Sequence, residues 1–290
     1  MKHAIYTSAA AIGLFAVTPA HADDLRGGGK LLLTNGISTV EGAAGGGLTP
    51  WAVIAGNGTK DGIGAQAAVT IAEVESYDFR SLSVAIGIFD RVELSYARQN
   101  FNTNEIGAVL GIGQDFAFDQ DVYGAKVKLL GDVVYGAPML PAIAAGIQYK
   151  KNLDAPIVAA VGARHSEGAD YYVSATKLLL SHSVLLNVTA RATKANQLGI
   201  LGFGGDKDDS YDLHFEGSAA YQLSRRFVIG GEYRSKPDKL GIAREHDWFD
   251  AFAAYAINRN LTATVAYSDL GSIATVPDQR GVLFQLQAGF

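Results

Sequence analysis

Apolar and polar side chains alternate through the last ten residues of the chain. Val282, Phe284, Leu286, Ala288 and Phe290 fall on one side of an extended strand, and the side chains between them are mostly polar. Because successive side chains of a strand point to opposite faces, this pattern predicts one apolar and one polar face. Such a last strand, ending on an aromatic residue, is typical of a transmembrane β-barrel. An amphipathic strand ending a soluble domain is the alternative.

The same alternation recurs in segments of strand length at residues 63–72, 82–88, 92–97, 123–129, 143–149, 186–191, 213–223, 227–233, 249–255 and 261–267. A further segment fits less well, because its adjacent apolar residues Leu178 and Leu179 would lie on opposite faces. The longest uncharged run of the chain after its leader, 133–149, contains Pro138 and Pro141, which would break a helix. A closed barrel is the remaining architecture that could span a bilayer.

Connection lengths also alternate, as they do in outer-membrane barrels. Counting back from a periplasmic Phe290, short connections fall on the periplasmic side near residues 258–259, 224–226, 181–182 and 90–91. Longer connections fall outside near residues 271–280, 235–246, 195–210, 151–169 and 100–121. Two connections depart from the size rule: 131–141 is long for a periplasmic turn, and 74–78 is short for an external loop.

The number of strands depends on the glycine-rich front of the chain. Thirteen candidate strands can be counted from Trp51 onward, whereas bacterial single-chain barrels have an even number. Pairing of residues 30–37 would make fourteen strands, and folding residues 51–56 inward as a plug would leave twelve. Glycine runs at 27–29 and 45–47 permit either, and the alternation of loop sides favours fourteen. We therefore expect an all-β, antiparallel transmembrane barrel of about 12–14 strands.

The amino-terminal residues have the pattern of a secretory signal peptide. Lys2 precedes an apolar run, and Ala20 and Ala22 supply the small residues before a cleavage site. Residues 1–22 are therefore expected to be removed, leaving a single barrel domain at 23–290. Without a twin-arginine motif, the general secretion route is favoured. The expected location is the outer membrane of a Gram-negative bacterium.

Composition narrows the classes of partner. The net charge of −5 argues against a nucleic acid, whose phosphates need a basic surface. The absence of cysteine excludes disulfides and a lipid-anchored cysteine. The expected partners are outer-membrane lipid, lipopolysaccharide, a small solute and the bacterial barrel-assembly machinery. The chain end resembles the signal that this machinery reads, in which a polar residue and a glycine precede alternating apolar residues. The matching residues are Gln279, Gly281, Phe284, Leu286 and the terminal Phe290.

Segments spread over nearly the whole chain after the leader carry a resemblance to a known family. They are residues 31–34, 41–51 (EGAAGGGLTPW), 89–95 (FDRVELS), 170–178 (DYYVSATKL), 191–196 (RATKAN) and 236–238. Together they resemble a proteobacterial family known as domain of unknown function 3034. The resemblance implies an outer-membrane protein and supplies no activity, substrate or catalytic residue.

Motifs for cofactors, metals and catalysis are weak. The glycine-rich runs lack the spacing of a phosphate-binding loop, and the acidic run at 206–209 lacks the glycine and distant glutamate of a calcium loop. A lipid hydrolase could use His214 with Ser218, which share one strand face with Glu216. A polar lumen is the favoured interpretation of these residues, because no Gly-x-Ser-x-Gly elbow is present. We expect no enzyme, no cofactor and no metal.

Charged residues of both signs share the inward, polar faces of the expected strands. The candidate lumen-lining residues are Glu93, Lys126, Lys128, Arg191, His214, Glu216, Glu232 and Arg234. Mixed charge sets solute preference in a narrow channel, and in a closed barrel it forms salt bridges that fill the interior. The favoured function is a narrow or gated passage for a small solute. A non-conducting structural or envelope-assembly barrel is the alternative, and a barrel lipid hydrolase is a more distant one.

Overall fold

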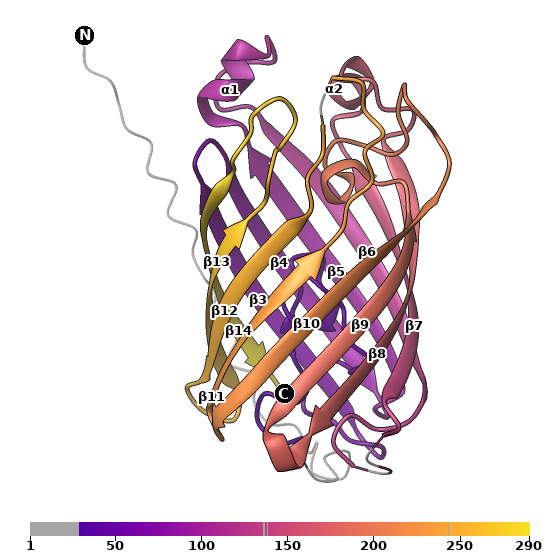
Figure 1. Cartoon of the computed structure of the whole chain (residues 1–290), viewed down its shortest axis with the longest axis vertical. Coiled ribbons are helices and arrows are strands. Elements are labelled where there is room, and N and C mark those ends of the chain that lie inside the picture. Colours follow the sequence, from indigo (N-terminus) through magenta and orange to yellow (C-terminus); the bar gives the residue numbers. More distant parts are fainter. Residues whose placement is uncertain (1–28, 136, 138, 243) are drawn as a thin grey trace, which may run out of the picture.

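The computed structural model describes residues 29–135, 137, 139–242 and 244–290. Within this part of the chain, twelve strands close into one antiparallel barrel, in which β14 returns to pair with β3 (Figure 1). The strands are β3 (Ile63–Val74), β4 (Asp78–Ile88), β5 (Val92–Asn102), β6 (Ala117–Leu130), β7 (Ala142–Asn152), β8 (Glu167–Leu179), β9 (Val184–Thr193), β10 (Asp212–Ser224), β11 (Phe227–Arg234), β12 (Trp248–Ala256), β13 (Leu261–Asp269) and β14 (Arg280–Gly289).

The remaining elements are short. The helices α1 (Asn104–Val109) and α2 (Ala155–Ala160) lie at the end of the barrel opposite the carboxyl terminus (Figure 1). Two 3-10 helices are η2 (Leu180–His182) and η3 (Asn196–Gly199), and β1 (Ile37–Ser38) pairs with β2 (Ala44–Gly45). In the described residues, no helix is both long and apolar enough to cross a membrane.

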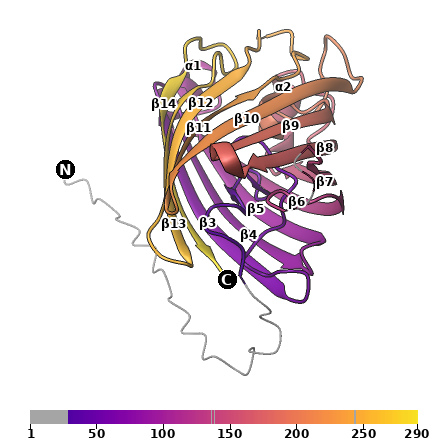
Figure 2. The same ribbon diagram turned by 60° about the horizontal axis from the view of Figure 1, so that its bottom comes forward.

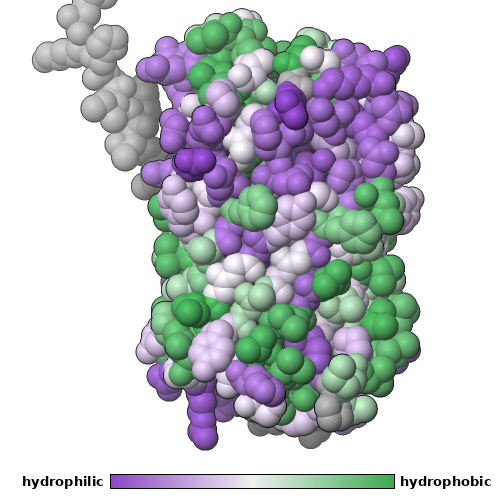
Figure 3. All heavy atoms as spheres, viewed as in Figure 1, coloured by the Kyte–Doolittle hydropathy of each residue, from purple (hydrophilic) through white to green (hydrophobic). Residues whose placement is uncertain are grey.

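The outer face of the barrel carries the apolar rows of the strands. Phe284 and Leu286 are 50% and 40% exposed, whereas Gln285 between them is 1% exposed. Hydrophobic residues gather on the lower part of the face in Figure 3, and hydrophilic ones on the upper part. Contacting rings of Tyr96, Tyr123 and Tyr149 on neighbouring strands resemble one of the aromatic girdles of membrane barrels. The expected all-β barrel with outward apolar rows is confirmed.

The preference for fourteen strands is wrong, because the front of the chain does not join the barrel. Residues 34–55, hereafter the plug, fold into the lumen, where they are all buried (Figure 2). Outside β1, which pairs with β2, no residue of 30–37 or 51–56 belongs to a described strand. The plug contains large apolar residues without a two-residue alternation, and Trp51 and Ile54 are at most 4% exposed. A strand in the barrel wall would have placed half of its side chains in lipid.

The irregular segment predicted around Leu178 is a regular strand, β8, whose inward row ends on an apolar residue. Leu178 is buried in the cluster formed by Trp51, Leu185 and other inward residues, and Leu179 lies on the outer face. The plug gives an inward leucine an apolar neighbour, which the sequence pattern alone did not reveal.

The carboxyl terminus closes the barrel at the seam between β14 and β3. The Phe290 carbonyl oxygen accepts hydrogen bonds from the backbone N–H groups of Asn57 (2.8 Å) and Ala65 (2.9 Å). The chain leaving the plug is thus fixed at the same end as the last residue. The expected signal peptide, residues 1–22, lies outside the described residues.

Candidate functional site: the plugged lumen

Glu41 is the only charged residue of the plug, and it is fully buried. Its carboxylate accepts a hydrogen bond from Arg234 Nη1 at 2.7 Å and forms ion pairs with Lys150 and, at 3.6 Å, with Arg191. These three cations come from β11, β7 and β9. A single plug side chain therefore contacts cations of three strands on one side of the barrel.

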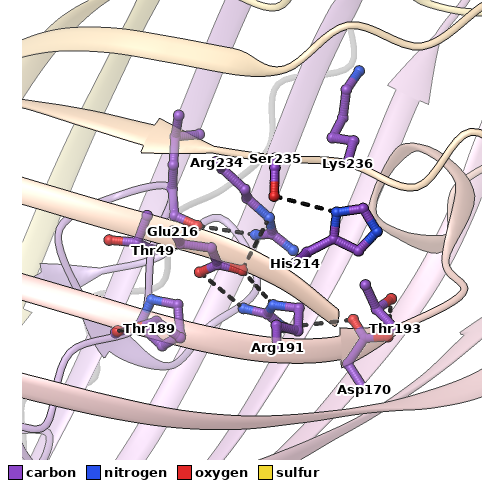
Figure 4. Close-up of polar contacts among 12 residues, drawn as sticks. Thr49, Asp170, Thr189, Arg191, Thr193, His214, Glu216, Arg234, Ser235 and Lys236 are labelled. Carbon is purple, nitrogen blue, oxygen red and sulfur yellow. Dashed lines mark hydrogen bonds and ion pairs between the residues drawn. The ribbon is translucent and has the colours of Figure 1, made fainter. Parts of the chain in front are cut away.

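The same cations also bind acids of the barrel wall, and Figure 4 shows Arg191 and Arg234 beside Glu216. Lys150 is 2.5 Å from Asp170, and Arg191 pairs with Glu216 and donates a hydrogen bond to Gln148 at 2.6 Å. Buried charges are costly unless they are paired, and this cluster satisfies that condition. It contains three cations and three acids, namely Lys150, Arg191, Arg234, Glu41, Asp170 and Glu216.

A second buried ion pair, Glu93 with Lys126, contacts the plug backbone at two separated segments. Lys126 Nζ lies 3.0 Å from Glu93 and donates hydrogen bonds to the carbonyl oxygens of Ala44 (2.9 Å) and Trp51 (3.2 Å). The Glu93 carboxylate accepts from the backbone N–H groups of Ala44 (3.1 Å) and Ala55 (2.8 Å). Each charge therefore contacts two separated points of the plug backbone.

Glu232 holds the turn of the plug without a basic partner among the described residues. Its carboxylate accepts from the Leu48 backbone N–H at 2.7 Å and from the hydroxyls of Thr49 and Ser218 at 2.6 and 2.7 Å. A Cβ at Gly46 would lie 2.1 Å from this carboxylate, so any larger residue there would displace it.

Lys128 lies at the end of the barrel that holds the carboxyl terminus rather than in the middle of the lumen. It pairs with Asp90, which also lies 3.0 Å from Lys30. Lys30 donates a hydrogen bond to the Ile54 carbonyl oxygen at 2.5 Å, so both ends of the plug meet here beside a pocket of about 370 Å³. Phe89 and Asp90 have positive φ of 52° and 48°, as central residues of the turn in which the Arg91 N–H donates to the Ile88 carbonyl oxygen.

His214 faces inward, and its Nδ1 lies 3.2 Å from the Ser235 hydroxyl (Figure 4). That hydroxyl donates to the Phe215 carbonyl oxygen at 3.0 Å, and no carboxylate is hydrogen-bonded to the imidazole among the described residues. Ser218 contacts the plug residues Thr49 and Trp51 instead. The three parts of a nucleophile, base and orienting acid are therefore not assembled.

The inner surface divides into two walls. The charged wall, β5 to β12, carries every one of the charged side chains described above except Glu41, Lys30 and Asp90. The uncharged wall is formed by β13, β14, β3 and β4, whose inward rows contain no Asp, Glu, Lys, Arg or His. It contacts the plug through neutral hydrogen bonds. Gln285 donates to the Ser38 carbonyl oxygen at 2.8 Å, and Ser81 donates to that of Val40 at 3.0 Å.

Loops at the opposite end of the barrel cover the plug. The segment around η3 is buried, with the carbonyl oxygens of Leu198 and Ile200 accepting from Gln120 and Asn152 at 3.1 and 2.6 Å. Tyr77, in the loop between β3 and β4, donates to the Ile273 carbonyl oxygen, and burial, with the nearby Glu245 charge, raises the pKa of Tyr77 to about 12. An apolar chamber of about 60 Å³ remains between the plug and these loops.

Sequence reasoning missed six acidic or basic members of this site: Lys30, Glu41, Asp90, Lys150, Asp170 and Asp250, whose carboxylate accepts from the Glu232 backbone N–H. The alternation of inward and outward residues along each strand could have indicated three of them, because Lys150, Asp170 and Asp250 occupy inward positions. Glu41 has no such pattern around it. Among the described residues, no three His, Asp or Glu side chains are placed to hold a metal ion.

Residues 34–287 match the family described as protein of unknown function DUF3034, and the chain belongs to this family. A comparison with curated proteins gives no match. Among solved structures, the chain is similar to a KdgM porin at 10% identity, with 78% of this chain and 99% of that chain covered and a TM-score of 0.50. The KdgM porin in complex with disordered oligogalacturonate gives 10% identity, 78% and 99% coverage and a TM-score of 0.51. These similarities show a shared barrel fold.

Outer membrane phospholipase A from Escherichia coli is similar at 8% identity, with 77% of this chain and 92% of that chain covered and a TM-score of 0.44.

Proposed function

We propose that the protein is a non-enzymatic outer-membrane barrel that forms a narrow, gated passage for a small solute, with the plug as its gate. The observation that carries this proposal is the position of Glu41. It is the one charge of a short segment that joins the barrel wall only through noncovalent contacts and its two chain ends. A plug held by ion pairs can change position when those pairs break and its charges find new partners. A continuous packed core has no such second arrangement, and this distinguishes it from a gate.

Glu41 would act as the anchor of the gate. Removing one member of a buried ion cluster leaves its partners uncompensated and costs about 3–5 kcal/mol. Without Glu41, the remaining cluster has one excess positive charge, because it contains three cations and two acids. The plug should then leave its closed position more often. A non-conducting structural barrel would keep the lumen sealed even with a weakened anchor.

Planar-bilayer recordings test the passage. The unmodified protein is expected to give infrequent, small openings, and Glu41→Gln should raise the open fraction at least tenfold. Glu105→Gln, which changes a carboxyl in the external helix α1, is the matched control and should behave as the unmodified protein. Heat-modifiable migration of each protein on gels verifies that the barrel has formed. Folded proteins without current in all three cases would leave the structural role as the better proposal.

The proposed location is the outer membrane, reached through the general secretion route. The barrel-assembly machinery, lipid and lipopolysaccharide are the proposed partners there. The residues proposed for recognition by that machinery are Gln279, Gly281, Phe284, Leu286 and Phe290, the pattern described from the sequence. Deletion of Phe290 should leave export intact and lower the amount of heat-modifiable barrel in the outer membrane. An unchanged amount would contradict this assignment.

A lipid hydrolase is less well supported. The serine hydroxyl nearest to His214 is that of Ser235, which is engaged by the Phe215 backbone, and the imidazole lacks a hydrogen-bonded carboxylate in the described residues. Both features differ from the arrangement in which a base activates a serine.

A further inference from the structure

Several polar atoms on or beside the uncharged wall are buried without a hydrogen-bond partner in the described residues. Each of their side chains is at most 5% exposed. They are Trp248 Nε1, Ser268 Oγ, Thr264 Oγ1, Gln285 Oε1 and Gln66 Nε2, with Thr39 Oγ1 on the facing plug. Buried polar atoms are nearly always hydrogen-bonded, so each exception requires an explanation.

These atoms follow a line along the lumen. Trp248 and Ser268 lie near the external ends of β12 and β13, and Thr264 pairs across the sheet with Gln285 farther down. Gln66 pairs with Gly289, next to the carboxyl terminus at the periplasmic end. The unpaired donors and acceptors therefore extend from one end of the barrel to the other beside the plug.

The external end of this line opens into the chamber between the plug and the external loops. Trp248 and Ser268 both contribute to its lining, together with apolar residues that include Val40, Leu48 and Phe101. A volume of about 60 Å³ is too small for a large ligand, but it exceeds the roughly 10–15 Å³ that one water molecule needs. A small molecule with a polar group could enter this chamber and face the two unpaired donors.

Unpaired atoms also occur on the charged wall, at Gln120, Gln148 and His214. Gln148 accepts a hydrogen bond from Arg191, and Gln120 donates to the Leu198 carbonyl oxygen in the external loop. The plug is bound there by buried ion pairs. On the uncharged wall it is bound by neutral hydrogen bonds, which a hydroxyl or carbonyl group can replace one at a time.

We infer that the solute moves between the plug and the uncharged wall, and that it is a small, uncharged molecule bearing several hydroxyl or carbonyl groups. This inference rests on the gated passage proposed above and names its solute class and its route. The plug separates from the uncharged wall while the ion pairs keep it against the charged wall. Along β13, β14, β3 and β4, an ion would be desolvated beside inward rows that contain no opposite charge, which disfavours charged solutes. The charges nearest the external end of the route are already engaged, Asp250 by the Glu232 backbone N–H and Lys236 by Glu245.

Two engineered disulfides distinguish the routes, because the chain contains no cysteine of its own. Ser38→Cys with Ser83→Cys joins plug and uncharged wall at a point where the two hydroxyl oxygens are 2.9 Å apart. Thr49→Cys with Ser218→Cys joins plug and charged wall at a corresponding separation of 2.6 Å. In both pairs the two side chains point toward each other, as a disulfide requires.

Liposome swelling measures the passage, with xylitol as the uncharged probe and gluconate and glucosamine as charged probes of similar size. In the first variant, oxidation should reduce xylitol entry at least tenfold, and reduction should restore it. In the second variant, the oxidised and reduced forms should differ in xylitol entry by less than twofold. Equal effects of the two disulfides, or an effect of the second alone, would overturn the route. Entry of gluconate or glucosamine as fast as xylitol would overturn the solute class while the gated passage stands.

The unpaired hydroxyls provide an independent readout. Thr264→Val with Ser268→Ala removes two groups that have no protein partner, so the fold loses no hydrogen bond. Xylitol entry should fall roughly threefold for each hydroxyl that no longer binds the solute, the effect expected of one neutral hydrogen bond. Ser95→Ala, an inward hydroxyl on β5 of the charged wall, is the matched control and should leave entry unchanged. Entry unaffected by the double change would contradict the route, and no xylitol entry in either the unmodified protein or Glu41→Gln would refute the gated passage itself.

Discussion

The charged and uncharged walls hold the same plug by different means. On the charged wall, Glu41 and the Glu93–Lys126 pair connect the plug to strands through buried ion pairs. On the uncharged wall, Ser81 and Gln285 reach plug carbonyl oxygens through neutral hydrogen bonds. Breaking a buried ion pair costs about 3–5 kcal/mol, whereas a neutral hydrogen bond contributes about 0.5–1.5 kcal/mol. The plug can therefore stay attached to the charged wall while it separates from the uncharged wall.

The largest expected effect is on the charged wall. Arg191→Met removes the cation that contacts Glu41, Asp170 and Glu216 and leaves buried acids uncompensated. The free energy of unfolding should fall by about 3–5 kcal/mol, measured by denaturant unfolding in lipid vesicles with tryptophan fluorescence. Arg280→Met is the control, because the Arg280–Asp269 pair is exposed to solvent and should contribute little to stability. Similar losses for the two arginines would show that burial of the cluster does not stabilise the barrel.

The outer faces of the two walls should not differ. Phe284→Arg on β14 and Val188→Arg on β9 each place a charge at an outward position that is at least 50% exposed. Both changes should lower the free energy of unfolding by about 2–4 kcal/mol if the positions lie near the bilayer midplane. The same vesicle unfolding assay measures them. A large difference between these two variants would mean that one outer face is covered by something other than lipid.

The sequence predicts much of the barrel wall and little of the plug. The two-residue alternation identified eleven of the twelve barrel strands, and β8 fitted it less well. The pattern is informative because every wall segment separates lipid from lumen. It also identified inward residues such as Glu93 and Lys126. Their direct pairing across β5 and β6 could not be predicted, since the long loop between these strands does not fix their register.

The plug could not be predicted because it is buried on all sides and has no repeating pattern. Trp51 and its neighbours therefore gave the appearance of a thirteenth strand, and the count moved toward fourteen. Glu41 finds its partners on β7, β9 and β11, more than a hundred residues away in the sequence. Only the closed barrel brings those cations together.

A smaller effect is expected from the neutral anchor of the uncharged wall. Gln285→Met removes the donor that binds the Ser38 carbonyl oxygen and the Thr70 hydroxyl, both at 2.8 Å. The buried Ser38 oxygen loses a partner, so the free energy of unfolding should fall by about 1–2 kcal/mol, clearly less than for Arg191→Met. A loss as large as that of Arg191→Met would contradict the distinction between the walls.

The smallest effect is expected where the uncharged wall has hydroxyls without partners. Thr264→Val replaces a buried hydroxyl that forms no hydrogen bond in the described residues with a methyl group of similar size. Its free energy of unfolding should stay within about 0.5 kcal/mol or rise, because no partner is left unsatisfied. Thr189→Val is the matched change on the charged wall. Its hydroxyl is hydrogen-bonded to the Pro50 carbonyl oxygen of the plug and to Ser174 at 2.9 and 2.8 Å, so this variant should lose about 1–3 kcal/mol. If the two variants were destabilised equally in the same assay, the Thr264 hydroxyl would have a partner after all, and its availability to a passing solute would be excluded.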